Sequence, residues 1–268
     1  MKIIISPAKK MNVNTDSLPG EQLPEYLEDA KTLCEILRSM SYEEAKALWK
    51  CNDKLARLNF ERHAHMDLEA AQTPAVLSYE GLQYQYMAPE VFSRDALCYI
   101  REHLRILSGL YGVLRPFDRV TPYRLEMQAG LSAEGKKDLY EFWGDKCYRA
   151  VRDIDGVIVN LASKEYSRIV EAYLKPEDRF LTIVFGELSN GTIRQKGTLA
   201  KMARGEMVRY IAESRIEDPE EIKKFCALEY AFSAEHSVER EWVFLRREAS
   251  KPSEPQILDL KKCESRLL

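Results

Sequence analysis

The chain has 268 residues, of which 45% are hydrophobic and 31% are charged, and its formal net charge is −3. This composition is typical of a soluble globular protein, and the mildly acidic charge excludes a uniformly basic coat for nucleic acid. Six cysteines without a C-x-x-C pair argue against a disulfide framework and fit a reducing compartment. No apolar run approaches the roughly 20 residues that span a bilayer, and no targeting segment is evident, so we expect a cytoplasmic protein that does not contact membranes.

Apolar runs and helical periodicity alternate through the first hundred residues. Residues 2–6 (KIIIS) are typical of a short buried strand, and Pro7 ends it because proline lacks a backbone donor. Lys9 and Lys10 follow in a basic turn. They either belong to a functional site at the end of the strand or are ordinary solvated turn residues. The other predicted elements are helices from Pro24, from Ser41 with a capping box to Glu44, from Asp53, and from Ser93 to His103, and a strand over residues 73–79.

The second half of the chain continues this alternation. Predicted helices cover residues 136–152, 163–174, 198–215 and 218–227, and predicted strands cover residues 157–160, 180–187, 192–196 and 241–246. Ser189-Asn190-Gly191 predicts a hairpin turn between two of these strands. Residues 248–268 have mixed charge and are expected to form a flexible tail. Interleaved strands and helices predict a mixed α/β (α+β) fold.

Residues 104–127 (LRILSGLYGVLRPFDRVTPYRLEM) combine four arginines with two glycines, two prolines and two acids. Arginine presents a planar, always-charged fork of donors to phosphate or carboxylate, and glycine allows close approach of the backbone. The segment is typical of a rigid anion-binding loop; the alternative is a surface turn whose arginines pair with nearby acids. Together with the preceding helix, Gly109 and Gly112 resemble a helix–hairpin–helix DNA-binding element. Their spacing of three and the early Pro116 depart from that motif.

A second basic stretch lies in residues 192–215, which carry six basic residues and two acids. At about 100° per residue, Lys201 and Arg204 fall on the polar face of the predicted helix and Arg209 on its margin. Gly205, between them, costs about 1 kcal/mol relative to alanine in a helix and leaves room for another group to approach. This segment therefore has two interpretations: it forms one wall of an anion-binding cleft, or it is an ordinary solvated amphipathic helix.

No recognised catalytic or nucleotide-binding motif occurs in the chain. Asn160 ends a predicted buried strand, with Ser163 and Glu165 just beyond, where an α/β protein places its site; the alternative is a helix-capping arrangement. The sequence around His63 and His65 looks like a metal cluster, but residues two apart do not share a helix face, so we expect no metal site and no cofactor.

Seven sequence blocks occur together and in order: ISPAK (5–9), NDKLA (52–56), HLRILSGLYGVLRPFD (103–118), PYRLEM (122–127), KDLYEFWGD (137–145), VIVNLASKEY (157–166) and KMARGEMVRYI (201–211). Across residues 1–247 the chain resembles the YaaA family of bacterial peroxide-stress proteins. The resemblance implies one compact domain of unusual mixed topology, called a cantaloupe fold, with a positively charged cleft and a helix–hairpin–helix element. It also implies binding to duplex and branched DNA, a response to hydrogen peroxide that limits iron-driven damage, and a link to recombination repair.

These observations lead to two hypotheses about function. The first is a DNA-binding stress protein that contacts phosphates without reading sequence. Its expected contacts are Lys9, Arg105, Gly109, Gly112, Arg115, Arg119, Tyr123, Arg124, Asn160, Ser163, Lys201, Arg204 and Arg209. The second is an enzyme acting on a nucleotide or another phosphorylated small molecule in the same arginine-lined cleft, with Glu126 or Glu165 as general acid or base. Direct iron binding ranks below both, and the sequence leaves the oligomeric state open.

Overall fold

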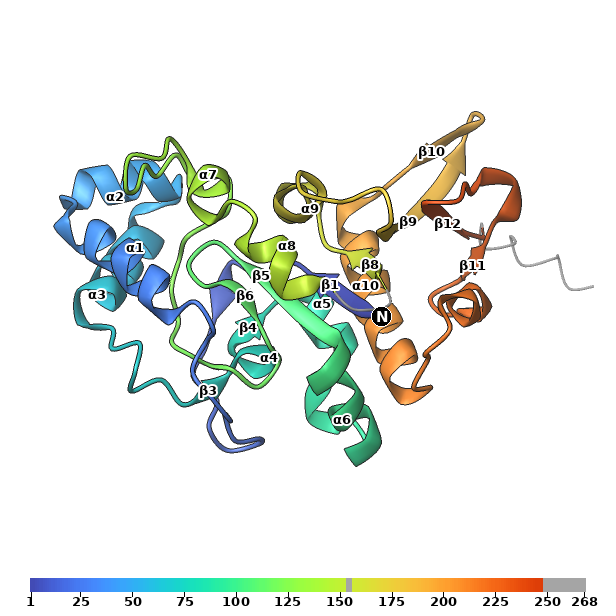
Figure 1. The fold of residues 1–268 in the computed structure, drawn as a ribbon, viewed down its shortest axis with the longest axis horizontal. Helices are drawn as coiled ribbons and strands as arrows, with labels where there is room; N and C mark the ends of the chain where they lie inside the picture. The colour runs from blue at the N-terminus through green and yellow to red at the C-terminus, as the bar shows by residue number, and fades with distance from the viewer. Residues whose placement is uncertain (153–155, 248–268) are drawn as a thin grey trace, which may run out of the picture.

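The fold is built around one mostly parallel β-sheet, seen in Figure 1. The computed structural model describes residues 1–152 and 156–247. Its strands are β1 (Lys2–Ile5), β2 (Lys10–Met11), β3 (Thr73–Pro74), β4 (Tyr79–Glu80), β5 (Leu104–Ser108), β6 (Gly112–Leu114), β7 (Arg119–Val120), β8 (Val157–Leu161), β9 (Arg179–Ser189), β10 (Thr192–Arg194), β11 (Tyr230–Phe232) and β12 (Glu241–Arg246). Within the described residues, the main sheet has the order β11-β12-β9-β8-β1-β5-β6, and β10 pairs with β9.

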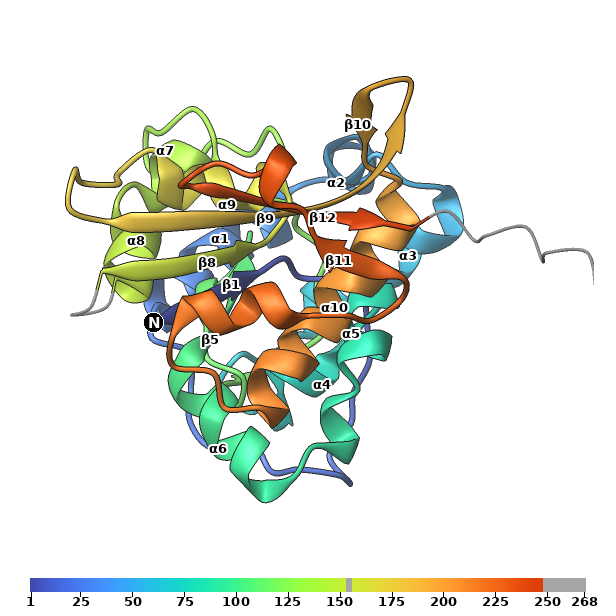
Figure 2. The same ribbon diagram turned by 90° about the vertical axis from the view of Figure 1, so that its right-hand side faces the viewer.

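Helices cover this sheet. They are α1 (Leu27–Ser39), α2 (Tyr42–Trp49), α3 (Asp53–His65), α4 (Ala75–Ser78), α5 (Leu82–Met87), α6 (Arg94–His103), α7 (Leu139–Trp143), α8 (Lys146–Val151), α9 (Lys164–Glu171) and α10 (Gly197–Glu213), with the short 3-10 helices η1 (Pro89–Val91), η2 (Pro219–Lys224) and η3 (Ala234–His236). Helix α10 packs on α5 and α6, and α8 packs on α9. Figure 2 shows strands of the sheet between α8 and α10. The fold is thus a single mixed α/β domain.

Strand order reverses at the middle of the sheet. The parallel neighbours of β1 are β5 on one side and β8 on the other, and β8 continues outward to β9 and β12. The chain therefore proceeds from β1 to one side and from β8 to the other. The carboxyl ends of β1 and β8 lie side by side, because Ile5 is in register with Leu161. In open α/β sheets such a switch point is the usual place for a ligand crevice.

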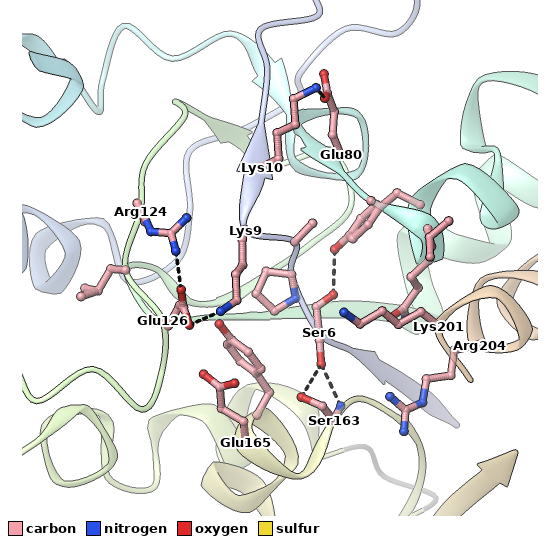
Figure 3. A pocket seen from close by; sticks show the side chains of 18 of the residues that line it. Ser6, Lys9, Lys10, Glu80, Arg124, Glu126, Ser163, Glu165, Lys201 and Arg204 are labelled. Atoms are coloured by element: carbon pink, nitrogen blue, oxygen red, sulfur yellow. Dashed lines mark hydrogen bonds and ion pairs between the residues drawn. The ribbon is translucent and has the colours of Figure 1, made fainter. Parts of the chain in front are cut away.

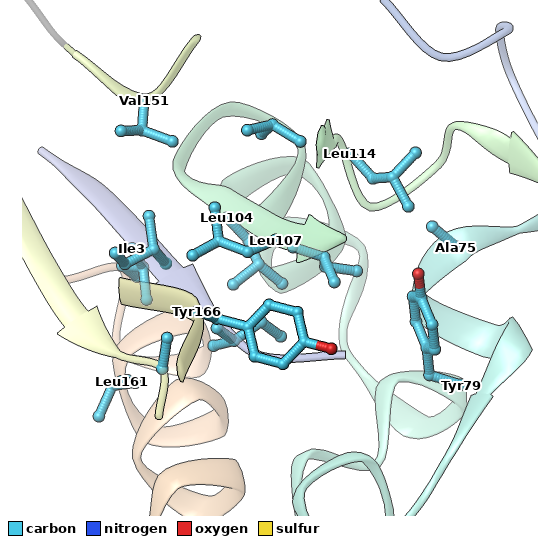
Figure 4. Close-up of a cluster of buried hydrophobic side chains, with 14 of the residues drawn as sticks. Ile3, Ala75, Tyr79, Leu104, Leu107, Leu114, Val151, Leu161 and Tyr166 are labelled. Atoms are coloured by element: carbon cyan, nitrogen blue, oxygen red, sulfur yellow. The ribbon is translucent and has the colours of Figure 1, made fainter. Parts of the chain in front are cut away.

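The core explains why the central strands are apolar throughout. Ile3, Ile4 and Ile5 are all fully buried, because β1 is covered on both faces and therefore lacks polar alternation. Ile3 is in register with Leu104 of β5 and Val159 of β8, and Figure 4 shows Ile3 next to Leu104. Full burial of one such side chain contributes about 1.5–3 kcal/mol. The predicted strand at residues 2–6 and the predicted strands at 157–160, 180–187 and 241–246 are confirmed.

Two predicted elements differ in the structure, and one helix is additional to those predicted. Residues 73–79 form β3, one turn of helix α4 and the start of β4, because the carbonyls of Asp118 and Pro116 accept the amides of Ala75 and Val76. The helix predicted over residues 136–152 is split into α7 and α8 at Gly144, whose φ is +51°. Helix α5 was not predicted. The predicted tail, residues 248–268, lies outside the described residues.

The helix–hairpin–helix prediction is also corrected at the level of secondary structure. Helix α6 is present, but the glycine turn after it joins two antiparallel strands, β5 and β6. Gly112 pairs with Ser108 across this β-hairpin and has a φ of +68°. Residues 112–114 therefore form a strand in place of the second helix that the motif requires. The apolar residues of both strands are buried in the sheet, which favours strand pairing over a short exposed helix.

Candidate functional site

A pocket of about 380 Å³, lined by both charged and apolar side chains, opens at the carboxyl ends of β1 and β8 (Figure 3). We call it the switch-point pocket; it is lined by Ser6, Pro7, Ala8, Lys9, Lys10, Glu80, Gly81, Leu82, Gln83, Tyr84, Tyr123, Arg124, Leu125, Glu126, Ser163, Glu165, Tyr166, Lys201 and Arg204. It brings together eight of the predicted site residues: Lys9, Tyr123, Arg124, Glu126, Ser163, Glu165, Lys201 and Arg204. Its lining includes five basic and three acidic side chains.

Two serines hold the floor of the pocket together. Ser6 follows β1 and Ser163 follows β8. The backbone N–H of Ser163 donates to Ser6 Oγ at 2.8 Å, and the Ser6 hydroxyl donates to Ser163 Oγ at 3.2 Å. The Tyr84 hydroxyl donates to the Ser6 carbonyl at 3.0 Å. These bonds fix the two strand ends relative to α5, so the floor is rigid. Ser163 occupies the N-cap position of α9 without a side-chain cap bond, which leaves its hydroxyl at the pocket.

Glu126 is held by two cations on one side of the pocket. Lys9 Nζ lies 2.7 Å from Glu126 Oε2, and Arg124 Nη2 lies 3.0 Å from Glu126 Oε1. The Arg124 and Glu126 side chains are only 10% and 18% exposed. Partly buried, charge-assisted bonds of this kind are stronger than surface pairs. Both carboxylate oxygens of Glu126 are thus engaged, and its orientation is fixed.

Glu165 lies on the same side of the pocket and is half-buried. Burial raises the pKa of its carboxyl above the usual value, and the negative charge of Glu126 raises it further. The N–H of Gln128, which donates to Glu165 Oε1 at 3.4 Å, and the charge of Lys9 oppose this increase. A carboxyl whose pKa moves toward neutrality is suited to proton transfer.

The opposite side of the pocket is formed by α10 and α5. Lys201 and Arg204 both lie on α10, and among the described residues no carboxylate pairs with either of them. Burial lowers the pKa of Arg204, and its buried Nε has no hydrogen-bond partner. Gln83 of α5 is 7% exposed, and its side-chain Nε2 also has no partner. In Figure 3 the Lys201 amine points toward Ser6, and the Arg204 guanidinium lies near Ser163.

Tyr123 contributes its ring to the lining of the pocket. The Tyr123 hydroxyl lies 2.6 Å from Ser108 Oγ and 2.9 Å from the Tyr79 hydroxyl. Burial raises the pKa of Tyr123 to about 12, so its phenol stays protonated at neutral pH. Its hydrogen bonds are directed into the core. Tyr123 therefore contributes mainly a fixed ring surface, rather than charge, to the pocket.

Three predicted arginines of residues 104–127 lie elsewhere. Arg105 donates to the Leu104 carbonyl at 2.8 Å, and Arg115 pairs with the buried Asp118 at 3.4 Å. The side chain of Arg119 packs against Gly20. The structure brings none of these three to the switch-point pocket. Of the three, Arg115 pairs with an acid of the same loop, as the alternative of a surface turn proposes, whereas Arg105 donates to backbone carbonyls and the buried Nε of Arg119 has no hydrogen-bond partner.

The predicted glycines and two polar residues also lie outside the pocket lining. Gly109 lies against the backbone of Leu125 and Glu126, and Gly112 lies against the Trp143 ring. Asn160 Oδ1 accepts the amide of Ala162 at 2.9 Å, which is a local turn. Arg209 lines a separate surface hollow beside Glu206 and Tyr210.

Sequence reasoning missed several lining residues. Ser6 had a usable signal, because it ends an apolar strand that the sequence identified. Gln83 and Tyr84 had none, because α5 is a helix of six residues without a cap bond. Gly205 was placed on the polar face of its helix, but it is buried against α5. The group that approaches it is the Gln83 backbone.

The fold and pocket define a class of protein: an α/β domain with a ligand-sized pocket of mixed charged and apolar lining at the switch point of its sheet. No helix in residues 1–152 or 156–247 is long and apolar enough to cross a membrane. In the same residues, no group of three or more His, Cys, Asp or Glu side chains could hold a metal ion.

Comparison with known proteins identifies the family. The family model described as peroxide stress protein YaaA matches residues 1–236. A UPF0246 protein of Lachnoclostridium phytofermentans is 53% identical over 250 residues, covering 93% of this chain and 98% of its own. UPF0246 proteins of Agathobacter rectalis and Pediococcus pentosaceus are 53% and 47% identical, covering 92% and 94% of this chain and 99% and 100% of their own. The chain belongs to the YaaA family of peroxide stress proteins.

Proposed function

We propose that this protein acts in the response to hydrogen peroxide by binding phosphate groups of DNA at the switch-point pocket, and that this limits peroxide- and iron-driven DNA damage. Family membership supports the peroxide part of the proposal. One observation carries the DNA part: Lys201 and Arg204 line the pocket without a carboxylate partner among the described residues. Of the other lining cations, Lys9 and Arg124 pair with Glu126, and Lys10 pairs with Glu80.

The pocket's size limits how DNA enters it. Ligand pockets usually enclose about 300–1,000 Å³, and this one, at about 380 Å³, is far too small for a duplex. A single phosphate-bearing unit enters, such as a strand end or an unpaired nucleotide at a branch. Lys9 and Lys10, whose side chains are 63% and 79% exposed, lie at the rim and attract the approaching backbone. Contacts of this kind give affinity without sequence preference.

The test is a titration of fluorescent single-stranded, duplex and branched DNA at ~50 and ~200 mM salt. The double variant Lys201→Ala with Arg204→Ala should weaken binding and reduce the slope of log K against log salt by about 2. Lys223→Ala with Lys224→Ala, on η2, is the control with the same change in charge. Absence of binding to every DNA at low salt refutes the DNA part. Equal affinity of the two double variants refutes the pocket as its location.

The cellular part of the proposal has its own test. A strain that lacks the gene should be killed faster by hydrogen peroxide and be rescued by the wild-type chain. The variant Lys201→Ala with Arg204→Ala should rescue it less well at equal protein level. Full rescue by this variant would show that the switch-point pocket is not needed for peroxide resistance.

A second candidate function is catalysis on a phosphorylated small molecule in the same pocket. The observation that favours it is the raised pKa of Glu165, next to Glu126 and across the pocket from Lys201. In this function Glu165 is the general acid or base. A ligand at 100 times its Kd adds about 2.7 kcal/mol of stability, so a thermal-shift screen with nucleotides and sugar phosphates detects it. If none of these compounds stabilises the protein, the candidate is rejected.

A further inference from the structure

The two sides of the switch-point pocket differ in their charged groups: the α10 side carries two cations, and on the other side Lys9 and Arg124 balance Glu126 and Glu165. On the α10 side, Lys201 and Arg204 have no acidic partner within the described residues. On the other side, Glu165 stands next to Glu126, whose two oxygens are already engaged. A ligand that satisfies both sides carries an anionic group at one end and N–H donors at the other.

Buried donors on the α10 side strengthen this argument. Gln83 is 7% exposed and its amide Nε2 has no partner, and Arg204 Nε is likewise buried and unpartnered. An unsatisfied buried donor costs about 1–3 kcal/mol, so such groups point to acceptor oxygens supplied by a ligand. Gly205 brings the backbone of Gln83 into direct contact with α10. Gln83, Lys201 and Arg204 therefore form one rigid wall, suited to the several oxygens of a phosphate.

Apolar side chains also line the pocket. Pro7, Ala8, Leu82 and Leu125 line it together with the ring of Tyr166. Tyr166 is 7% exposed and its pKa is raised by burial, so its phenol is neutral. Apolar and aromatic surfaces of this kind accept a flat ring. The ligand's two polar ends are therefore joined by a ring-containing body.

Glu165 has acceptor capacity available for the ligand. Its Oε1 receives only the long bond of 3.4 Å from the Gln128 amide. Carboxylates recognise exocyclic amino groups of nucleobases in this manner. Both oxygens of Glu126 are already engaged by Lys9 and Arg124, so Glu165 is the carboxylate left to accept a hydrogen bond from an amino group on the ligand's ring.

We propose that the switch-point pocket binds one nucleotide unit, with its phosphate toward Lys201, Arg204 and Gln83 and the amino edge of its base toward Glu165. This inference rests on the phosphate-binding function proposed above and adds the part of the ligand that is recognised. The unit comes either from a free nucleotide or from a DNA end. The same atoms recognise both sources, and the experiment separates them.

The test is calorimetric titration of the full chain with AMP, CMP, ribose 5-phosphate and inorganic phosphate, and with a short single strand. AMP or CMP should bind at least about tenfold more tightly than ribose 5-phosphate, because one good base contact is worth about 1–3 kcal/mol. Glu165→Leu removes both acceptor oxygens and should abolish the preference for AMP and CMP over ribose 5-phosphate. The control is Glu61→Leu, at an exposed glutamate on α3, which should leave that preference as it is in the wild-type chain.

A change on the ligand side keeps the inference testable if Glu165→Leu fails to fold. Dimethylation of the exocyclic amine of AMP or CMP removes its donors and should weaken binding to the wild-type chain by about tenfold. Equal binding of nucleotides and ribose 5-phosphate overturns base recognition but leaves phosphate binding intact. Binding of DNA without binding of any mononucleotide also overturns this inference. Absence of binding to every phosphate ligand, DNA included, refutes the proposed function itself.

Discussion

The contact between α5 and α10 at Gly205 determines how the α10 side of the pocket is built, and it yields a sharp prediction. A Cβ atom at this position would lie 2.9 Å from both Gln83 C and Met87 N, and closer still to the Gln83 carbonyl oxygen. These are backbone atoms of α5, so no side-chain rotation relieves the overlap. Overpacking of this kind costs about 3 kcal/mol at the upper end of its usual range. The gain in helix propensity from Gly to Ala is about 1 kcal/mol.

Gly205→Ala should therefore lower the free energy of unfolding by about 2 kcal/mol, or Tm by about 4–8 °C. Gly197→Ala is the matched control, because Gly197 lies on the same helix and a Cβ there meets nothing within 4 Å. It should be neutral or stabilising. Urea unfolding followed by circular dichroism measures both variants. If the two variants unfold at the same urea concentration, α5 moves away from the new Cβ without loss of stability, and the argument that Gln83, Lys201 and Arg204 form a rigid wall fails.

Three further predictions concern other parts of the fold. Burial lowers the pKa of His63 to about 4, so its neutral form stabilises the fold above pH ~6.5 and this contribution is lost as pH falls toward 4. The wild-type chain should therefore lose about 2 kcal/mol more unfolding free energy between pH 7 and pH 4.5 than the variant His63→Phe loses. If urea unfolding gives both proteins the same pH dependence, this prediction is wrong. Gly112→Ala should lower the free energy of unfolding by at least about 2 kcal/mol, because φ at this position is +68° and the new Cβ would lie 2.8 Å from the Trp143 ring. If unfolding followed by fluorescence shows the same stability as the wild-type chain, this expectation is contradicted. Ser6→Ala should lower the free energy of unfolding by about 1–2 kcal/mol, because the Ser163 amide loses its acceptor at 2.8 Å. A thermal melt identical to that of the wild-type chain would show that the hydrogen bond between Ser6 and Ser163 contributes nothing to stability.

The sequence predicts those parts of the fold whose signals are local. Continuous apolar runs identify β1, β8, β9 and β12, and the Ser41–Glu44 capping box marks the start of α2, where both of its bonds are present. The failures occur where tertiary contacts decide the conformation. Residues 75–78 turn into a helix because two carbonyls near Asp118 accept their amides. The glycines after α6 form a β-hairpin because the strands on either side of them are buried in the sheet.

The site could be predicted only in part, for a related reason. The sequence indicated Lys9, Lys201 and Arg204 as candidate phosphate contacts, and the structure places all three at one pocket. What residue type could not show is pairing across the chain. Arg115 and Arg124 look equivalent in the sequence, yet the first pairs with Asp118 within the loop and the second with Glu126 at the pocket. Pairing depends on long-range geometry, so an arginine-rich segment does not by itself locate an anion site.

The arginine-rich segment nevertheless determines the site indirectly. Its hairpin carries Gly109, where the absence of a side chain lets the backbone of Leu125 and Glu126 pass at close range. The Trp143 indole donates to the Gly109 carbonyl at 3.0 Å and holds the turn in place. Glu126 is thereby brought to Lys9, which lies between β1 and β2, and the two form one side of the pocket. A side chain at position 109 would meet the backbone of Leu125 and Glu126 and displace the Glu126 carboxylate, so this glycine shapes the pocket through backbone packing.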